Sequence, residues 1–203
     1  MELILIRHGI TPGNLERRFV GRIDQPLAPE GQALARSVAS ALPQVEHVYR
    51  SPMLRCRQTA DLLWQGVPQT VIENLHETDF GIYEGKCHAE LQDDPVYRRW
   101  LAGELTVGEP IENCNARAAS ALAELAADAA ERGWRRAGVV AHGGIFMSML
   151  ARFGLPKRDY YDWLLPNCGG FRAQLDPATL TLRITGRAGA EEGGAPVPKP
   201  TEV

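Results

Sequence analysis

Short apolar runs alternate with segments of helical periodicity along most of the chain. The apolar runs are rich in leucine and β-branched residues, which predicts buried strands at 2–7, 45–50, 70–75 and 136–141. Apolar spacing of three and four residues predicts helices at 30–42, 53–65, 112–132 and 145–153, with one or two short helices within 88–103. Because strands alternate with helices, we expect an α/β fold with a mostly parallel, twisted sheet and helices on both faces.

The C-terminal part departs from this alternation. Two apolar runs, at 167–175 and 179–185, flank the turn sequence Asp176-Pro177-Ala178, which predicts a strand pair with an antiparallel edge. After Gly186 the chain is dominated by Gly, Ala, Glu and Pro, a composition that cannot bury a core. We therefore expect one domain at 1–185 followed by a flexible tail at 186–203.

Polar residues follow each predicted parallel strand. His8, Ser51, Glu77 and His142 come after the first, second, third and fourth of these strands. Ligands of such sheets bind beyond the carboxyl ends of the strands, so we expect these four side chains to meet at one rim. Ser51 with Pro52 behind it is also a natural N-cap for the helix at 53–65. The glycine- and proline-rich segment 8–28, a loop with one helical turn, would lie at the same rim.

Composition excludes some functions. The chain has 203 residues, 44% of them hydrophobic and 23% charged, as in an ordinary soluble globular protein. Its net charge of −3 supplies no field that would recruit nucleic acid or an anionic membrane. The four cysteines form no CxxC pair, so we expect reduced thiols in a cytoplasmic protein rather than a zinc or redox site. No signal-peptide core or membrane span is apparent, which agrees with a cytoplasmic location.

Each candidate residue alone is more often structural, but the combination favours phosphoryl transfer. A phosphate monoester needs planar bidentate donors, which Arg7 and Arg55 could supply. It also gains from N–H groups at a helix N-terminus, such as the one that Gly143-Gly144 would open. An imidazole is uncharged near neutral pH, which makes His8 the candidate nucleophile. A carboxylate could then protonate the departing alcohol.

Five separated motifs strengthen this interpretation. In chain order they are Arg7-His8-Gly9 with Thr11 and Asn14; Gly21 with Asp24, Pro26, Leu27 and Gly31; Ser51-Pro52 with Arg55 and Gln58-Thr59-Ala60; Leu75-His76-Glu77 with Asp79-Phe80-Gly81 and Glu84-Gly85; and Val139-Val140-Ala141-His142-Gly143-Gly144. Together they resemble the histidine phosphatase superfamily, in the branch of cofactor-dependent phosphoglycerate mutases and α-ribazole phosphatases. Three positions depart from the usual pattern without removing a required residue: Ile10, Cys56 and Tyr83.

The resemblance implies a phosphohistidine mechanism. It implies the catalytic set His8, Glu77, His142, Arg7 and Arg55. It implies phosphate or substrate contacts from Arg7, Thr11, Asn14, Gly21, Arg55, His142 and Gly143. Glu77 would be the proton donor, with Asp79 and Glu84 as alternatives. No metal and no cofactor are implied; the partner would be a small phosphomonoester, and a homodimer is the family expectation.

The substrate is less constrained than the chemistry. Segments 77–85 and 157–170 resemble α-ribazole phosphatases, which act late in cobalamin biosynthesis. Aromatic side chains could stack a base or could belong to the core: Tyr97, Trp100, Tyr160, Tyr161 and Trp163. A phosphoglycerate mutase and a broad-specificity phosphatase remain alternatives. A non-catalytic phospho-ligand binding domain would predict the loss of an essential residue, and all five catalytic candidates are present.

Overall fold

The computed structural model describes residues 1–191, which form one mixed sheet. Within these residues the sheet has seven strands in the order β3-β2-β4-β1-β6-β7-β5. The strands are β1 (Glu2–Arg7), β2 (His47–Arg50), β3 (Gln69–Val71), β4 (Arg136–Ala141), β5 (Gly154–Leu155), β6 (Gly169–Asp176) and β7 (Thr181–Gly189). Strands β3, β2, β4 and β1 are parallel to one another, whereas β6 runs antiparallel to both β1 and β7. The predicted fold class is confirmed.

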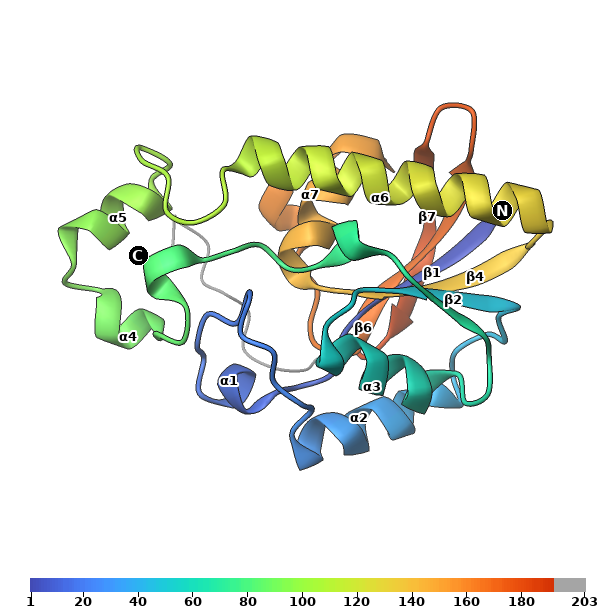
Figure 1. Ribbon diagram of the computed structural model, residues 1–203, viewed down its shortest axis with the longest axis horizontal. Helices are drawn as coiled ribbons and strands as arrows, with labels where there is room; N and C mark the ends of the chain where they lie inside the picture. The colour runs from blue at the N-terminus through green and yellow to red at the C-terminus, as the bar shows by residue number, and fades with distance from the viewer. Residues whose placement is uncertain (192–203) are drawn as a thin grey trace.

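Helices cover both faces of the sheet. They are α1 (Pro12–Leu15), α2 (Pro29–Ala39), α3 (Leu54–Leu63), α4 (His88–Leu91), α5 (Pro95–Leu101), α6 (Ile111–Arg132) and α7 (Gly143–Phe153), with 3₁₀ turns η1 (Glu73–Leu75), η2 (Gly81–Tyr83) and η3 (Tyr160–Trp163). Helices α6 and α7 lie on one face and α2 and α3 on the other, while α1, α4 and α5 gather beyond one end of the sheet (Figure 1). In residues 1–191 no helix has both the length and the apolar character that a membrane span requires.

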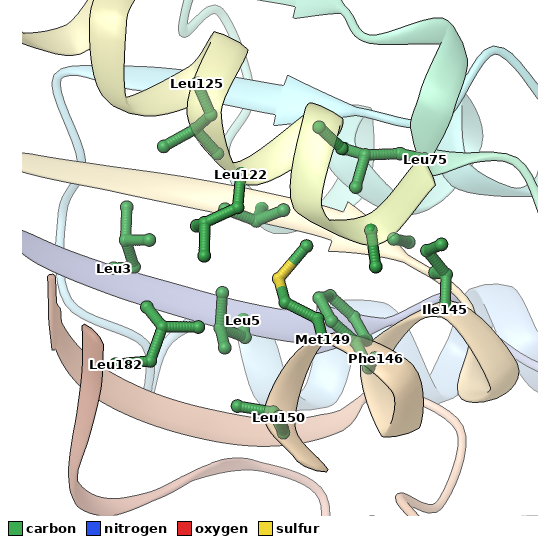
Figure 2. Packing of buried hydrophobic residues seen from close by; sticks show 14 of the residues in the cluster. Leu3, Leu5, Leu75, Leu122, Leu125, Ile145, Phe146, Met149, Leu150 and Leu182 are labelled. Atoms are coloured by element: carbon green, nitrogen blue, oxygen red, sulfur yellow. The ribbon is translucent and has the colours of Figure 1, made fainter. Parts of the chain in front are cut away.

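Strand β1 supplies side chains to the core on both faces. Leu3 and Leu5 are fully buried against α6 and α7, and Figure 2 shows them opposite Leu122 and Leu125 of α6. The alternate residues Ile4 and Ile6 point to the other face and join the cluster under α2 and α3, because successive side chains of a strand point to opposite faces. This two-sided burial explains why the run is continuously apolar.

A smaller aromatic cluster lies beyond the sheet. It contains Phe19, Tyr83, Leu91 and Tyr97, and it fastens α4 and α5 to the loop after α1. Tyr97 is fully buried in this cluster, and Trp163 is fully buried against Phe171 in the main core. For these two aromatics the structure therefore shows core packing rather than a surface on which a base could stack.

Three sequence predictions need correction. The third strand is shorter than expected: β3 ends at Val71 and η1 follows, because Leu75 turns inward to pack under α6. The second strand starts at His47 rather than at residue 45. Ser51 does not cap the next helix, since α3 begins at Leu54 with Met53 as its N-cap. Its hydroxyl instead takes part in the site described below.

The predicted tail is also partly wrong. Strand β7 continues to Gly189, so residues 186–189 pair with residues 169–172 of β6 and belong to the sheet. Their low β-propensity conceals this from the sequence, because pairing with a neighbouring strand outweighs local preference. The remainder of the predicted tail, 192–203, lies outside the described residues.

Replacing Leu122 by alanine should remove a fully buried side chain from the centre of the α6 packing. We expect the free energy of unfolding to fall by about 2–5 kcal/mol, measured by urea titration. Glu124→Ala is the matched control, since Glu124 lies exposed on the same helix and should change stability by less than about 0.5 kcal/mol. Equal losses in both variants would contradict the assignment of Leu122 to the core, because alanine favours the helix at either position.

Candidate active site

His8 lies directly after β1 and is held in one orientation. Its backbone N–H donates to the carbonyl of Ala141 at 2.9 Å, which places it beside the end of β4. Its ring Nδ1 lies 2.7 Å from the carbonyl oxygen of Gly9. A carbonyl only accepts, so Nδ1 carries the ring proton and Nε2 keeps a free lone pair. The buried imidazole is therefore prepared to act as a nucleophile through Nε2.

The loop after His8 is tied to α3 across the sheet end. The Gly9 N–H donates to Oγ1 of Thr59 at 2.9 Å, and that hydroxyl donates to the Arg55 carbonyl at 2.7 Å. A Cβ on Gly9 would lie 3.1 Å from the carbonyl oxygen of Gly31, so the loop packs closely there. The hydrogen bonds through Thr59 couple the position of His8 to the first turn of α3.

Arg55 is a fully buried guanidinium held by backbone carbonyls. Nη2 donates to the carbonyls of Gly21 at 2.9 Å and Val20 at 3.2 Å, and Nη1 donates to that of Ile23 at 2.9 Å. The Gly21 N–H in turn donates to the Glu84 carboxylate at 3.1 Å. In the structure Gly21 thus supports Arg55, and a direct contact between Gly21 and substrate stays a prediction.

His142 lies directly after β4 between Arg55 and Ser51. Nε of Arg55 donates to its Nδ1 at 3.2 Å, so the ring proton is on Nε2, which donates to the Ser51 hydroxyl at 2.7 Å. The centroids of the His8 and His142 rings are 5.1 Å apart. Cys56, one of the unusual positions, is buried with Sγ 3.4 Å from Nε2 of His142. Ser51 was expected at this rim, but its role as a partner of His142 was not.

Arg7 lies beside the N-terminus of α7 and has N–H groups without a hydrogen-bond partner among the described residues. Nη1 donates to the Leu165 carbonyl at 2.7 Å, whereas Nε is buried without a hydrogen-bond partner among the described residues. A Cβ on Gly143 would lie 3.6 Å from Cζ of Arg7, so the guanidinium is beside the first residue of the helix. A buried donor without an acceptor is costly, and an anionic oxygen bound here would remove that cost.

Glu77 is bound to the same helix end. Its carboxylate accepts from the backbone N–H groups of Gly144 at 3.1 Å and Ile145 at 3.2 Å, where the helix dipole favours negative charge. From the sequence, the N-terminus that Gly143-Gly144 opens was expected to face an anion, with Gly143 as the contact. In the structure Glu77 takes the N–H of Gly144 and leaves that of Gly143 for a ligand, so the Gly143 contact stays a prediction.

The two alternative carboxylates bind loop amides instead. Asp79 accepts from the Gly81 N–H at 2.7 Å. Glu84 accepts from the N–H groups of Gly21 and Phe80 at 3.1 Å each. Both side chains therefore hold the loops around the rim. The carboxylate of Glu77 instead binds the N-terminus of α7, next to the guanidinium of Arg7.

Thr11 and Asn14 form a capping box at the N-terminus of α1. The Thr11 Oγ1 accepts from the Asn14 N–H at 3.3 Å, and the Asn14 Oδ1 accepts from the Thr11 N–H at 3.1 Å. Asn167, which the sequence analysis did not select, donates from Nδ2 to the same Oδ1 at 3.2 Å and to the His8 carbonyl at 3.0 Å. Since Oδ1 already has two donors, the amide NH₂ of Asn14 is the group left for a ligand. The only sequence signal for Asn167 was a polar residue beside an apolar strand.

The electrostatics of the site favour an anionic ligand. Burial, followed by the charges of Arg55 and Arg7, lowers the pKa of His8 well below its ordinary value. Burial and Arg55 likewise lower the pKa of His142. Both rings are therefore neutral at neutral pH, while the guanidinium groups stay charged. A phosphate would meet two arginines, the Gly143 N–H and an uncharged imidazole.

Comparison with solved structures finds the same fold in other proteins. An α-ribazole phosphatase from Shigella flexneri aligns over 96% of this chain and 99% of its own, with a TM-score of 0.78 and 23% identity, which shows a common fold. A phosphoserine phosphatase from Entamoeba histolytica, solved with 3-phosphoglyceric acid, aligns over 94% of this chain and 98% of its own at 26% identity, with a TM-score of 0.75.

Sequence comparison extends this to the family. A probable phosphoglycerate mutase from Enterobacter sp. (strain 638) is 31% identical over 134 residues, 61% of this chain and 62% of the relative. The chain thus matches about three fifths of the length of such relatives. The family model described as histidine phosphatase superfamily (branch 1) matches residues 3–185, the whole segment that carries the site. The chain belongs to the histidine phosphatase superfamily, branch 1.

Proposed function

We propose that this protein hydrolyses phosphomonoesters through a phosphohistidine intermediate on His8, without a metal ion. The observation that carries the proposal is the state of His8: a buried neutral ring whose Nδ1 is bound to the Gly9 carbonyl, so that Nε2 is free to attack. The two arginines near it supply the positive charge that a metal ion would otherwise provide.

In the first step, the lone pair of His8 Nε2 attacks phosphorus and the P–O ester bond breaks. Arg7 retains its Nε–H and both Nη2 hydrogens for the equatorial oxygens, because Nη1 has its partner in Leu165. Arg55 retains one hydrogen on Nη1 after its bonds to carbonyls and to His142. The Asn14 amide is a further donor on the same rim, whereas the Nε2–H of His142 is already bound to the Ser51 hydroxyl.

We assign the proton transfers to Glu77. Its carboxyl group protonates the ester oxygen as the alcohol leaves, and the resulting carboxylate accepts a proton from the water that attacks phosphohistidine. The P–N bond then breaks, releasing inorganic phosphate and restoring neutral His8. The position of Glu77 at the N-terminus of α7, beside Gly143, supports this assignment over Asp79 and Glu84.

For the physiological substrate we propose α-ribazole 5′-phosphate. The support comes from segments 77–85 and 157–170, which resemble α-ribazole phosphatases. A phosphoglycerate mutase activity is the alternative to test, because sequence relatives are named as probable phosphoglycerate mutases. A mutase would pass the phosphoryl group from His8 to a second hydroxyl, whereas a hydrolase passes it to water.

Replacing His8 by alanine should abolish both the intermediate and turnover. We expect kcat to fall by more than about a thousand-fold, because no other described side chain replaces a free Nε2 at this position. Rapid quenching with ³²P-labelled substrate should trap acid-labile, alkali-stable label in the wild type and none in the variant. His88→Ala is the control, since His88 contacts Tyr97 in the aromatic cluster. Label that persists in His8→Ala would disprove the nucleophile.

The neutral state of His8 should be visible as a displaced titration. A ring with a lowered pKa takes up its proton only below the ordinary value of about 6.5, so it stays neutral through that pH. We expect ¹⁵N-histidine NMR spectra to show His8 as the Nδ1–H tautomer at pH 6.5 and above, with His8→Gln used to assign the signal. A midpoint at or above 6.5 would contradict the proposed electrostatics.

A substrate panel in the presence of a chelator should separate the candidate activities. We expect phosphate release from α-ribazole 5′-phosphate with higher kcat/KM than from 3-phosphoglycerate or 4-nitrophenyl phosphate, and no loss of activity in EDTA. Even, slow release from all three would retain the chemistry but remove the α-ribazole assignment. Conversion of 3- to 2-phosphoglycerate in place of phosphate release would establish the mutase.

A further inference from the structure

Arg117 on α6 forms a largely buried ion pair with Glu109 that has no part in the steps above. Its Nε and Nη2 donate to the two oxygens of Glu109, each at 2.7 Å. The two side chains are only 14% and 11% exposed. Burial acts to raise the pKa of Glu109, but the hydrogen bond and charge of Arg117 outweigh it and lower the pKa overall. The pair is therefore a charged, two-point clamp.

The third nitrogen of Arg117 reaches the segment that carries the proposed acid. Nη1 donates to the carbonyl of Asn74 at 2.8 Å and to that of His76 at 2.9 Å. The second of these carbonyls belongs to the peptide bond that joins His76 to Glu77. One guanidinium thus binds Glu109 on one side and the backbone directly before Glu77 on the other.

The backbone after Glu77 is held by the same stretch of chain. The Glu109 N–H donates to the Asp79 carbonyl at 2.8 Å. The hydroxyl of Thr78 lies 3.5 Å from Sγ of Cys114, one turn before Arg117 on α6. Glu77 itself lies outside any helix or strand, so no ladder of backbone hydrogen bonds fixes its position.

We infer that Arg117, through its pair with Glu109, is a positioning residue for proton transfer by Glu77, an inference that rests on the acid role proposed above. Arg117 holds the backbone before Glu77, the backbone N–H of the paired residue Glu109 holds the Asp79 carbonyl after it, and α7 holds the Glu77 carboxylate. Displacement of a reacting group by about 1 Å can cost about 100-fold in rate. Loss of the clamp should therefore weaken the step that needs the proton and spare the steps that do not.

The test compares leaving groups of increasing basicity: 4-nitrophenyl phosphate, phenyl phosphate and benzyl phosphate. A 4-nitrophenolate ion departs without a proton, whereas benzyl alcohol must be protonated as it leaves. In Arg117→Met we expect kcat/KM, which reports the first phosphoryl transfer, to fall roughly 10- to 100-fold for benzyl phosphate. For 4-nitrophenyl phosphate it should fall by less than about three-fold.

Arg132→Met is the matched control, because Arg132 pairs with Asp128 on the exposed part of the same helix. It should leave all three rates unchanged. Arg117→Lys retains the charge but has a single nitrogen, so it should show the same dependence on leaving group with a smaller loss, even if the methionine variant folds poorly. Equal losses across the three substrates in the Arg117 variants would overturn the inference and leave Arg117 a purely structural residue.

Glu77→Gln, measured on the same series, separates the two proposals. A loss that grows with leaving-group basicity in Glu77→Gln, without such a trend in Arg117→Met, would overturn the clamp alone. A uniform loss in Glu77→Gln would overturn the acid role and the clamp with it. The inference is supported if both variants show the same trend and if the double variant Glu77→Gln/Arg117→Met loses less activity than the two single losses combined.

Discussion

The buried charge of Arg55 is the constraint on which the rest of the site depends. A guanidinium without contact to water is costly unless its hydrogens are satisfied and its charge is compensated. Three backbone carbonyls and the ring of His142 satisfy most of its hydrogens. These partners are neutral dipoles that compensate the positive charge only in part, which favours an anionic ligand at the site. The loop from Val20 to Ile23 is shaped by the need to provide those carbonyls.

Burial, together with the charge of Arg55, sets the protonation state of both histidines. Because burial and the neighbouring arginines disfavour protonation, His8 and His142 share the site as neutral rings with opposite tautomers. In His8 the proton is on Nδ1, bound to the Gly9 carbonyl. In His142 it is on Nε2, because Arg55 donates to Nδ1. One ring thereby keeps a free lone pair on Nε2, as the proposed nucleophile requires, and the other donates from Nε2 to Ser51, although the two side chains are chemically identical.

Parallel packing of β1 and β4 explains why distant segments meet. The pair β1–β4 brings His8 beside His142, and the helix that follows β4 presents its first N–H groups to the same rim. That helix end is shared: Glu77 takes the N–H groups of Gly144 and Ile145, and Gly143 remains next to Arg7. The proposed acid and the proposed phosphate site are thus built on one helix N-terminus.

The sequence by itself determined the alternation of strands and helices, and with it the expectation that His8 and His142 follow neighbouring parallel strands. Apolar periodicity and strand-end placement are local properties, so they survive without knowledge of the fold. Arg7, Arg55 and Glu77 could also be selected, because the motifs that contain them resemble those of a known family; for Glu77 the resemblance is the sole ground. Only the tertiary structure decided which atoms are free, because hydrogen bonds between residues far apart in the chain assign Ser51 to His142, Asn167 to Asn14 and Arg117 to the backbone beside Glu77. Such contacts leave no periodic trace in a sequence, since they depend on how separate elements pack.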